Sequence, residues 1–260
     1  MGVSIHPTAI VDPKAELGRG VTVGPYAVIG PHVVLGEECH VGAHCVIDGH
    51  TTVGARNRFF PFCAIGLEPQ DKKYRGEPTR VEIGNDNTFR EYCTVNSGTV
   101  QDRGVTTIGD DNWIMAYVHI AHDCVVGSHT IFANNATLGG HVQVGDWAIL
   151  GGFTGVHQFV RVGAHSFCGV GTVLTQDLPP YVTVAGNPAV PHGINSEGLR
   201  RRGFSPEAVR AIKRAYKTLY RQGLSLNEAI AQIAAASAEF PELEPLVAFL
   251  RTPGRGIVRG

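Results

Sequence analysis

Residues 23–36 read VGPYAVIGPHVVLG, and this stretch decides the fold. Every sixth residue is apolar, and a glycine follows each of them directly. A period of six fits neither an α-helix, with about 3.6 residues per turn, nor a strand, which alternates about every 2 residues. It predicts a coil with three short flat faces, in which each hexad supplies one inward apolar residue and one corner.

The six-residue phase extends outward from this stretch over most of the chain. The apolar anchor positions are Ile5, Val11, Leu17, Val23, Ile29, Leu35, Val41, Ile47, Val53, Phe59, Ile65, Ile83, Phe89, Val95, Ile108, Ile114, Ile120, Val126, Phe132, Leu138, Val144, Leu150, Val156, Val162, Cys168 and Leu174. Three hexads close one turn, and successive turns stack about 4.8 Å apart by parallel strand pairing. No single turn buries its own core, so stability requires many turns. We therefore expect a parallel β-helix over residues 1–190.

Composition restricts the possible functions. Of the 260 residues, 43% are apolar and 17% charged, which favours a large folded core over disorder. The net charge of −1 gives no general attraction to nucleic acid, and we expect no nucleic-acid partner. No apolar run is long enough for a membrane span, and the repeat starts at Ile5 without a secretory leader. These features predict a cytoplasmic protein.

Most of the cysteines follow the same repeat. Cys39, Cys45, Cys63, Cys93 and Cys124 each lie four residues after an anchor, in a position that elsewhere holds small residues. Cys168 is itself an anchor. With no CxxC pair, the pattern favours buried core thiols over a disulfide framework or a structural zinc site.

Two segments interrupt the repeat. The first gap would place Asp71 and Glu77 in anchor positions, so residues 67–80 are interpreted as a protruding loop. The second gap predicts a loop over residues 100–107. Long loops on a rigid scaffold often carry binding functions, although a purely decorative loop is the alternative.

The repeat ends near Pro188, and residues 191–260 are predicted to form a helical domain. Ser205-Pro206-Glu207 is a typical helix start, Ser225 and Glu228 fit a capping box, and Pro241-Glu242 begins a third helix. Residues 200–221 hold eight basic residues against one acidic residue. This basic segment could be a solvated face or could dock an acidic partner or a phosphate.

Three histidines gather near stacked anchors late in the repeat. Ile120, Leu138 and Val156 are one turn apart, and His122, His141 and His157 follow them closely. We expect these side chains on one wall of three successive coils. A neutral imidazole is a suitable general base for a hydroxyl or an amine, and Asp123 could stabilise the imidazolium that forms. Gly140 could offer a backbone N–H to an oxyanion.

Two other interpretations of the histidines remain open. Three histidines can bind zinc with a free position for water, but the His-x4-His spacing of γ-class carbonic anhydrases is missing, and we predict no metal. A purely structural role is the second alternative.

Several motifs resemble the UDP-N-acetylglucosamine acyltransferase family of the hexapeptide-repeat superfamily. They are HIAHDC at 119–124, GEPTR at 76–80, ANNATL at 133–138, HQF at 157–159 and GLRRRGF at 198–204. The resemblance covers essentially the whole chain. It implies a left-handed coil and transfer of a 3-hydroxyacyl chain from acyl carrier protein to the glucosamine 3-hydroxyl of UDP-N-acetylglucosamine, the first step of lipid A synthesis. It also implies a homotrimer with sites between subunits, and no cofactor beyond the phosphopantetheine of the carrier protein.

The resemblance further implies roles for individual residues. His122 would be the general base, Asp123 its partner and Gly140 the oxyanion donor. Asp71, Lys73 and Gln70 would contact the sugar and the phosphopantetheine. The cleft for the sugar and the acyl chain would be lined by His119, His141, His157 and Gln158. The nucleotide and the carrier protein would be bound by Asn195, Glu197, Arg201 and Arg202.

Two positions depart from well-known members of that family. Asn96-Ser97 replaces a His-Arg pair, which leaves open whether the acceptor is an alcohol or a 3-amino sugar. Val170 lies where relatives set the acyl length, and a branched side chain there predicts a short or medium chain. The alternatives to this enzyme are an N-acyltransferase of the same pathway, a metal-dependent hydratase and a non-catalytic scaffold.

Overall fold

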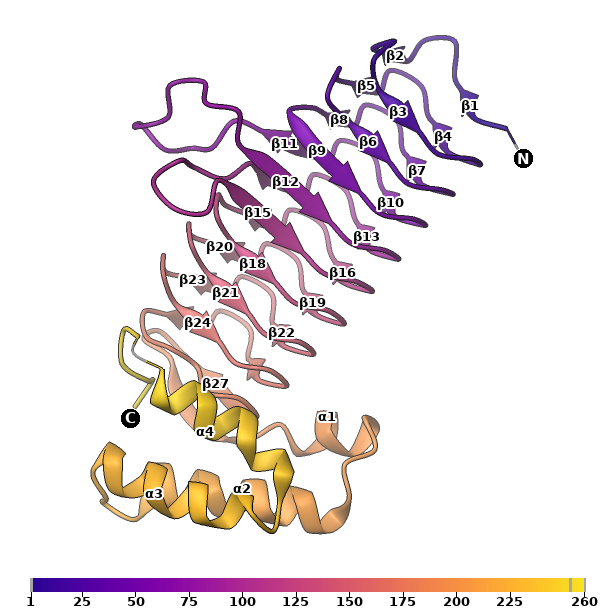
Figure 1. Ribbon diagram of the computed structural model, residues 1–260. Coiled ribbons are helices and arrows are strands. Elements are labelled where there is room, and N and C mark those ends of the chain that lie inside the picture. Colours follow the sequence, from indigo (N-terminus) through magenta and orange to yellow (C-terminus); the bar gives the residue numbers. More distant parts are fainter. Residues whose placement is uncertain (1, 253, 260) are drawn as a thin grey trace.

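The protein is described by a computed structural model that covers residues 2–252 and 254–259. Its strands wind into a long triangular coil, and helices pack at the C-terminal end of that coil (Figure 1). Strands on the same side of successive turns pair in parallel, so three sheets run along the coil. The parallel β-helix expected from the six-residue period is confirmed.

The three sheets are named A, B and C in the order in which the chain enters them. Sheet A contains β1 (Ser4–Ile5), β4 (Thr22–Val23), β7 (His40–Val41), β10 (Arg58–Phe59), β13 (Thr88–Phe89), β16 (Trp113–Ile114), β19 (Ile131–Phe132), β22 (Ile149–Leu150), β25 (Phe167–Cys168), β27 (Val182–Ala185) and β28 (Val190–Ile194). Sheet B contains β2 (Ile10–Val11), β5 (Val28–Ile29), β8 (Val46–Ile47), β11 (Ala64–Leu67), β14 (Thr94–Asn96), β17 (His119–Ile120), β20 (Thr137–Leu138), β23 (Gly155–Val156) and β26 (Val173–Leu174). Sheet C contains β3 (Glu16–Leu17), β6 (Val34–Leu35), β9 (His50–Val53), β12 (Arg80–Ile83), β15 (Val105–Ile108), β18 (Val125–Val126), β21 (Gln143–Val144) and β24 (Arg161–Val162).

The anchor residues form one continuous core inside the coil. Ile47, Phe59, Ile120 and Leu138 are fully buried, and strand pairing sets Ile120 directly against Leu138 of the next turn. Ile5 is the most exposed of the anchors, with 46% of its surface in solvent, and Val11 and Leu17 of the same turn are half-buried. It belongs to the first turn, which has a neighbouring turn on one side only.

The predicted core thiols are confirmed. All six cysteines are free and buried. In the small-residue position, the thiol donates to a backbone carbonyl of the following turn, as Cys63 does to Arg90 over 3.1 Å and Cys93 to Met115 over 3.1 Å.

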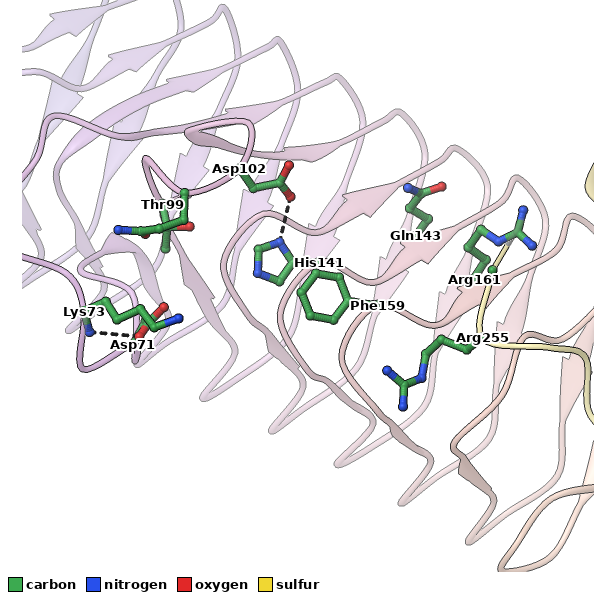
Figure 2. Close-up of a pocket in the computed structure, with 11 residues that line it drawn as sticks. Asp71, Lys73, Thr99, Asp102, His141, Gln143, Phe159, Arg161 and Arg255 are labelled. Atoms are coloured by element: carbon green, nitrogen blue, oxygen red, sulfur yellow. Dashed lines mark hydrogen bonds and ion pairs between the residues drawn. The ribbon is translucent and has the colours of Figure 1, made fainter. Parts of the chain in front are cut away.

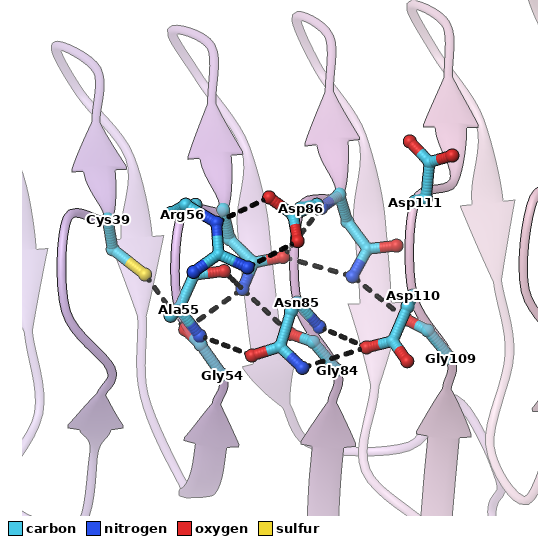
Figure 3. Close-up of polar contacts among 12 residues, drawn as sticks. Cys39, Gly54, Ala55, Arg56, Gly84, Asn85, Asp86, Gly109, Asp110 and Asp111 are labelled. Carbon is cyan, nitrogen blue, oxygen red and sulfur yellow. Dashed lines mark hydrogen bonds and ion pairs between the residues drawn. The ribbon is translucent and has the colours of Figure 1, made fainter.

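Three asparagines form a buried ladder inside one edge of the coil. The Asn87 amide donates to Asn57 Oδ1 over 3.0 Å, and the Asn112 amide donates to Asn87 Oδ1 over 2.8 Å. Outside the ladder, Arg56 pairs with Asp86, and Asn85 donates to Asp110 of the next turn (Figure 3). Because their polar groups are paired, these turns tolerate amides in an otherwise apolar interior.

Two loops leave the coil on the same side (Figure 1). The first, residues 68–79, joins β11 to β12, and the second, residues 97–104, joins β14 to β15. The second loop was expected at 100–107, but residues 105–107 already belong to β15 because they pair with β12. Asn96 and Ser97 hold the first loop. The Asn96 amide donates to the Glu68 carbonyl over 2.7 Å, and the Ser97 hydroxyl accepts from Thr79 over 3.1 Å.

The C-terminal helices follow the expected starts, with one addition. The elements are α1 (Ser196–Arg201), α2 (Pro206–Arg221), α3 (Leu226–Ser237), the 3-10 turn η1 (Pro241–Leu243) and α4 (Glu244–Arg251). The capping box of Ser225 and Glu228 at the start of α3 is confirmed. The short helix α1 was not expected. Residue 190, the expected domain boundary, is the first residue of β28, which returns antiparallel along β27.

Within residues 2–252 and 254–259, every helix is too short or too polar to cross a lipid bilayer.

Candidate active site

The candidate site lies at the corner that follows sheet B. His122 and Asp123 lie two and three residues after the end of β17, and Gly140 and His141 lie two and three residues after the end of β20, one turn further along. The last residue of each corner has a left-handed backbone, with φ of 59° at Asp123 and 64° at His141. This backbone turns the chain sharply after a buried anchor and presents corner side chains outward.

His122 and Asp123 form a hydrogen-bonded pair. His122 Nδ1 lies 2.9 Å from Asp123 Oδ2, and Asp123 is 2% exposed whereas the His122 side chain is 14% exposed. A carboxylate at Nδ1 favours the tautomer that carries a proton there and leaves Nε2 as the proton acceptor. The pair therefore has the arrangement of a general base with an orienting carboxylate.

Thr99, in the second loop, holds the carboxylate of Asp123 from the other side. Its backbone N–H lies 3.0 Å from both carboxylate oxygens, and its hydroxyl donates to Oδ2 over 2.6 Å. Burial alone would raise the pKa of Asp123, but the hydrogen bonds from His122 and Thr99 bring the net pKa below its usual value. Asp123 is therefore an anion at neutral pH.

Gly140 packs against the imidazole of His122. A Cβ at this position would lie 2.5 Å from His122 Cε1 and 2.6 Å from Nε2, closer than real Cβ contacts. Glycine is therefore required for His122 to keep its position. Among the described residues, the N–H of Gly140 donates no hydrogen bond, which leaves it free for a substrate oxygen.

His141 stands edge-on to His122. Their ring centroids are 4.9 Å apart and the rings are perpendicular. On its other side, the His141 ring stacks on Phe159 at 4.2 Å. His141 Nδ1 lies 2.7 Å from Asp102 Oδ2, so the second loop reaches this histidine as well.

A cavity of about 630 Å³ opens beside His141 (Figure 2). Asp71 and Lys73 of the first loop line one end, Thr99 and Asp102 of the second loop line the middle, and Arg161 and Arg255 line the far end. The two loops, the corners after sheet B, sheet C and the C-terminal segment thus line one space. Lys73 and Arg255 bring positive charge to the cavity and Asp71 and Asp102 bring negative charge, whereas Arg161 is paired with the buried Asp177 over 2.7 Å.

Of the three histidines expected on this wall, His122 and His141 are in contact, and the role of His157 stays a prediction. His157 is exposed and its ring nitrogen bonds the Gln158 carbonyl over 3.1 Å. His157, His122 and His141 occupy the first, second and third positions after their anchors. Gln70 and Gln158 are also exposed and lie outside the lining of the cavity.

His119 lies next to the pair on β17. Its Nδ1 is 2.7 Å from the hydroxyl of Thr94, and burial, followed by the charge of nearby His122, lowers its pKa. His119 is therefore a neutral neighbour of His122 at pH 7.

The predicted nucleotide-binding residues lie elsewhere, around α1. Asn195 caps α1 by accepting from the Gly198 N–H over 3.0 Å, and Glu197 pairs with Arg201 over 2.9 Å. Arg202 packs over the Trp147 ring at 5.1 Å. Val170 is 77% exposed, on the corner between sheets A and B. Within one chain, none of these residues lines the 630 Å³ cavity.

The alternative of a metal site has some geometric support. One ligand atom each of His122, Asp123 and His141 lie within 4.8 Å of one another. However, both Asp123 oxygens already accept hydrogen bonds from Thr99, and His157, needed for a three-histidine site, is not part of this group. The donor set therefore fits a hydrogen-bonded histidine–aspartate pair better, and a metal-free site stays a prediction.

Sequence reasoning missed several residues of the site. Thr99 and Asp102 lie in the second interruption, which was recognised as a loop without assigning its side chains. Arg161 and Arg255 had no recognisable motif, and Phe159 was quoted only as part of HQF.

Comparison with known proteins identifies the family. A family model described as UDP N-acetylglucosamine O-acyltransferase, domain 2, matches residues 177–258, and a bacterial transferase hexapeptide model matches residues 14–49 and 106–140. The chain is 62% identical over 256 residues to the acyl-[acyl-carrier-protein]--UDP-N-acetylglucosamine O-acyltransferase of Thiobacillus denitrificans, covering 98% of this chain and 99% of the relative. The chain belongs to the UDP-N-acetylglucosamine O-acyltransferase family.

Solved structures of this acyltransferase family agree with the assignment. The Francisella novicida UDP-N-acetylglucosamine acyltransferase superposes with a TM-score of 0.96 at 42% identity, covering 98% of this chain and 94% of that chain. The Campylobacter jejuni UDP-N-acetylglucosamine acyltransferase gives a TM-score of 0.93 at 38% identity, covering 99% and 100%. Membership of this acyltransferase family confirms the left-handed parallel β-helix with C-terminal helices.

Proposed function

We propose that this chain transfers a 3-hydroxyacyl group from acyl carrier protein to the glucosamine 3-hydroxyl of UDP-N-acetylglucosamine, the first step of lipid A biosynthesis. The observation that carries this proposal is the His122–Asp123 pair, which contacts two residues that line the cavity, His141 and Thr99. Such a pair can remove a proton from a hydroxyl. The names of relatives up to 62% identical support the choice of donor and acceptor.

The reaction needs no covalent enzyme intermediate. His122 Nε2 accepts the proton of the acceptor hydroxyl while the oxygen attacks the thioester carbon. The new C–O bond forms, the C–S bond breaks, and the thiolate of the carrier protein leaves and takes up the proton. The free N–H of Gly140 stabilises the negative charge on the carbonyl oxygen, a contribution of about 100- to 1000-fold for one such donor.

The cavity offers places for the rest of the substrates. Asp71 and Lys73 contact the sugar or the phosphopantetheine from the first loop, and Arg255 adds positive charge for a phosphate. No further cofactor is required because the acyl group arrives already activated as a thioester. The carrier protein is a cytoplasmic donor, so we place the enzyme in the cytoplasm.

The active form is a homotrimer with sites between subunits. Val170 and Phe153, which are 77% and 66% exposed in one chain, lie on the same corner of neighbouring turns. His157, Gln158, Arg201 and Arg202 also lie outside the cavity of their own chain. A neighbouring subunit would bring such residues to a shared cleft, where Val170 limits the acyl chain to short or medium length. Native mass spectrometry tests this point, and a monomer at working concentrations would contradict it.

The decisive experiment is mass spectrometry of the products. The purified protein is incubated with UDP-N-acetylglucosamine and a mixed pool of 3-hydroxyacyl carrier proteins. We expect one O-acylated nucleotide sugar, and at least a 1000-fold lower rate for His122→Ala. An unchanged rate of acyl transfer in His122→Ala would show that His122 is not the general base. A parallel reaction with the 3-amino analogue of the sugar nucleotide decides between the two acceptors.

A further inference from the structure

The second loop makes a contact that the proposed reaction does not use. Asp102 Oδ2 lies 2.7 Å from His141 Nδ1, with the Asp102 side chain 40% exposed and that of His141 14% exposed. Asp123 Oδ2 lies 3.9 Å from the same nitrogen. The site therefore contains two histidine–aspartate pairs, His122–Asp123 and His141–Asp102.

Three neighbours hold the ring of His141: Phe159, His122 and Asp102. Phe159 stacks on it with only 4° between the ring planes, and His122 meets it at 90°. With Nδ1 bonded to Asp102, the remaining ring nitrogen, Nε2, is available to the cavity that His141 lines. The orientation of this nitrogen is therefore set before any ligand arrives.

The loop does not need the Asp102 side chain to keep its shape. Thr99 ties the loop to Asp123, and the backbone groups of Gly98 and Gly104 bond those of Arg80 over 3.2 and 2.9 Å. Backbone bonds to the Thr99 carbonyl close the loop internally. The carboxylate of Asp102 is thus free to act on His141 alone.

We propose that Asp102 is a positioning residue that keeps a proton of His141 on Nδ1. A carboxylate only accepts hydrogen bonds, so Nδ1 must be the donor. Nε2 then presents a lone pair to the cavity and accepts a hydrogen bond from a hydroxyl or amide N–H of the sugar nucleotide. Asp102 thereby contributes to acceptor binding, while His122 performs the proton transfer. This inference rests on the proposed function for the identity of the acceptor.

Asp102→Asn tests the role of the proton directly. An asparagine amide can donate to Nδ1, which would move the proton of His141 to Nε2. We expect a shift of the His141 tautomer, seen by nitrogen-15 NMR of histidine-labelled protein. We also expect a rise of about 10-fold in KM for UDP-N-acetylglucosamine, the effect of losing one hydrogen bond of about 1.4 kcal/mol. The kcat should change by less than about threefold, because the His122–Asp123 pair is intact.

Two further variants complete the experiment. Asp102→Glu keeps the carboxylate, and its KM for UDP-N-acetylglucosamine should lie between those of Asp102→Asn and the wild type. Arg103 is an exposed neighbour on the same loop, and Arg103→Ala should change neither the His141 tautomer nor this KM. An unchanged tautomer or an unchanged KM in Asp102→Asn would overturn the inference. So would equal losses in kcat and kcat/KM with a lower melting temperature, because these indicate a loop that has lost its structure. If the wild type does not acylate UDP-N-acetylglucosamine at all, the proposed function fails, yet the NMR result still reports on the Asp102–His141 pair.

Discussion

Thr99 shows how much of the site depends on a single side chain outside the repeat. Its hydroxyl and its backbone N–H both donate to Asp123, but only the hydroxyl can be removed by mutation. Thr99→Val keeps the shape and the backbone bond, and leaves the buried carboxylate with one donor fewer. A hydrogen bond to a charged group contributes about 1.5–3 kcal/mol.

We expect Thr99→Val to lower kcat/KM by about 10- to 100-fold, because the less firmly held Asp123 orients His122 poorly. The pKa of Asp123 should rise toward its usual value. Steady-state kinetics measures the first effect. Thr52→Val, an exposed threonine on sheet C, is the matched control. If Thr99→Val has the kinetics of the wild type, the backbone N–H of residue 99 is sufficient to hold the Asp123 carboxylate in place.

Gly140 gives a second prediction at the residue scale. Gly140→Ala forces a methyl group against the His122 ring, which must move. We expect kcat to fall by about 100-fold or more, since a displacement of about 1 Å at a reacting group has this effect. Gly155→Ala, where a methyl group meets nothing within 4 Å, should keep full activity. Equal activities of the two variants would mean that His122 can shift without loss.

At the scale of elements, the corners of the coil connect the repeat to the helical domain. His165 follows β24, stacks near Tyr181 at 5.7 Å and meets Phe204 edge-on at 5.1 Å. Asn195, the cap of α1, donates to the His165 carbonyl over 3.1 Å. Burial, and then the charge of Arg202, lowers the pKa of His165 to about 4. This junction is therefore built around a neutral imidazole.

The low pKa of His165 predicts a loss of stability in acid. Between about pH 6.5 and 4 the unfolded chain binds a proton that the folded chain does not bind, so stability falls as the pH falls through this window. His165→Phe keeps an aromatic ring and removes the titration. Urea denaturation at about pH 7 and about pH 4.5 should show a smaller difference for this variant than for the wild type. Equal differences would exclude His165 as a source of acid sensitivity.

The strands inside the six-residue period and the starts of α2 and α3 could be predicted from the sequence, whereas the contacts made by the two loops could not. Each anchor forces its neighbours into a strand and a corner, so the register of Ile120 against Leu138 follows from counting. Thr99 and Asp102 lie in a loop that has no period, and only the folded loop shows that they reach Asp123 and His141. Counting gives the turn of the coil, but the position within a corner gives the direction of the side chain.

At the scale of the whole molecule, stability should depend on position along the coil. Each turn contacts only its neighbours, so a middle turn is supported from two sides and the first turn from one. Phe59 is fully buried and stacks on Phe89 at 5.0 Å, whereas Ile5 is 46% exposed.

Phe59→Ala should therefore lower the free energy of unfolding by about 3–5 kcal/mol, because it leaves a large cavity between packed turns. Ile5→Ala should lower it by less than about 1 kcal/mol, since much of that side chain is already in water. Urea denaturation of both variants measures the contrast. Similar losses would mean that the first turn is covered in solution.

The asparagine ladder has a consequence for how the chain finds its native pairing. Turns lined by valine, isoleucine and leucine are nearly interchangeable, so apolar packing alone does not determine which turn pairs with which. The risk of mispairing is greatest at the two insertions, where the chain leaves the coil and must return to the correct place. Asn57 precedes both insertions, Asn87 lies between them and Asn112 follows them. Asn87 and Asn112 each donate to the asparagine of the preceding turn, and a slip that left such a buried group unpaired would cost about 1–3 kcal/mol. The ladder thus favours the correct pairing of the turns that carry the first and second loops. We expect the Asn87→Leu variant to refold more slowly than the wild type, and hydrogen exchange should detect species with incorrectly paired turns.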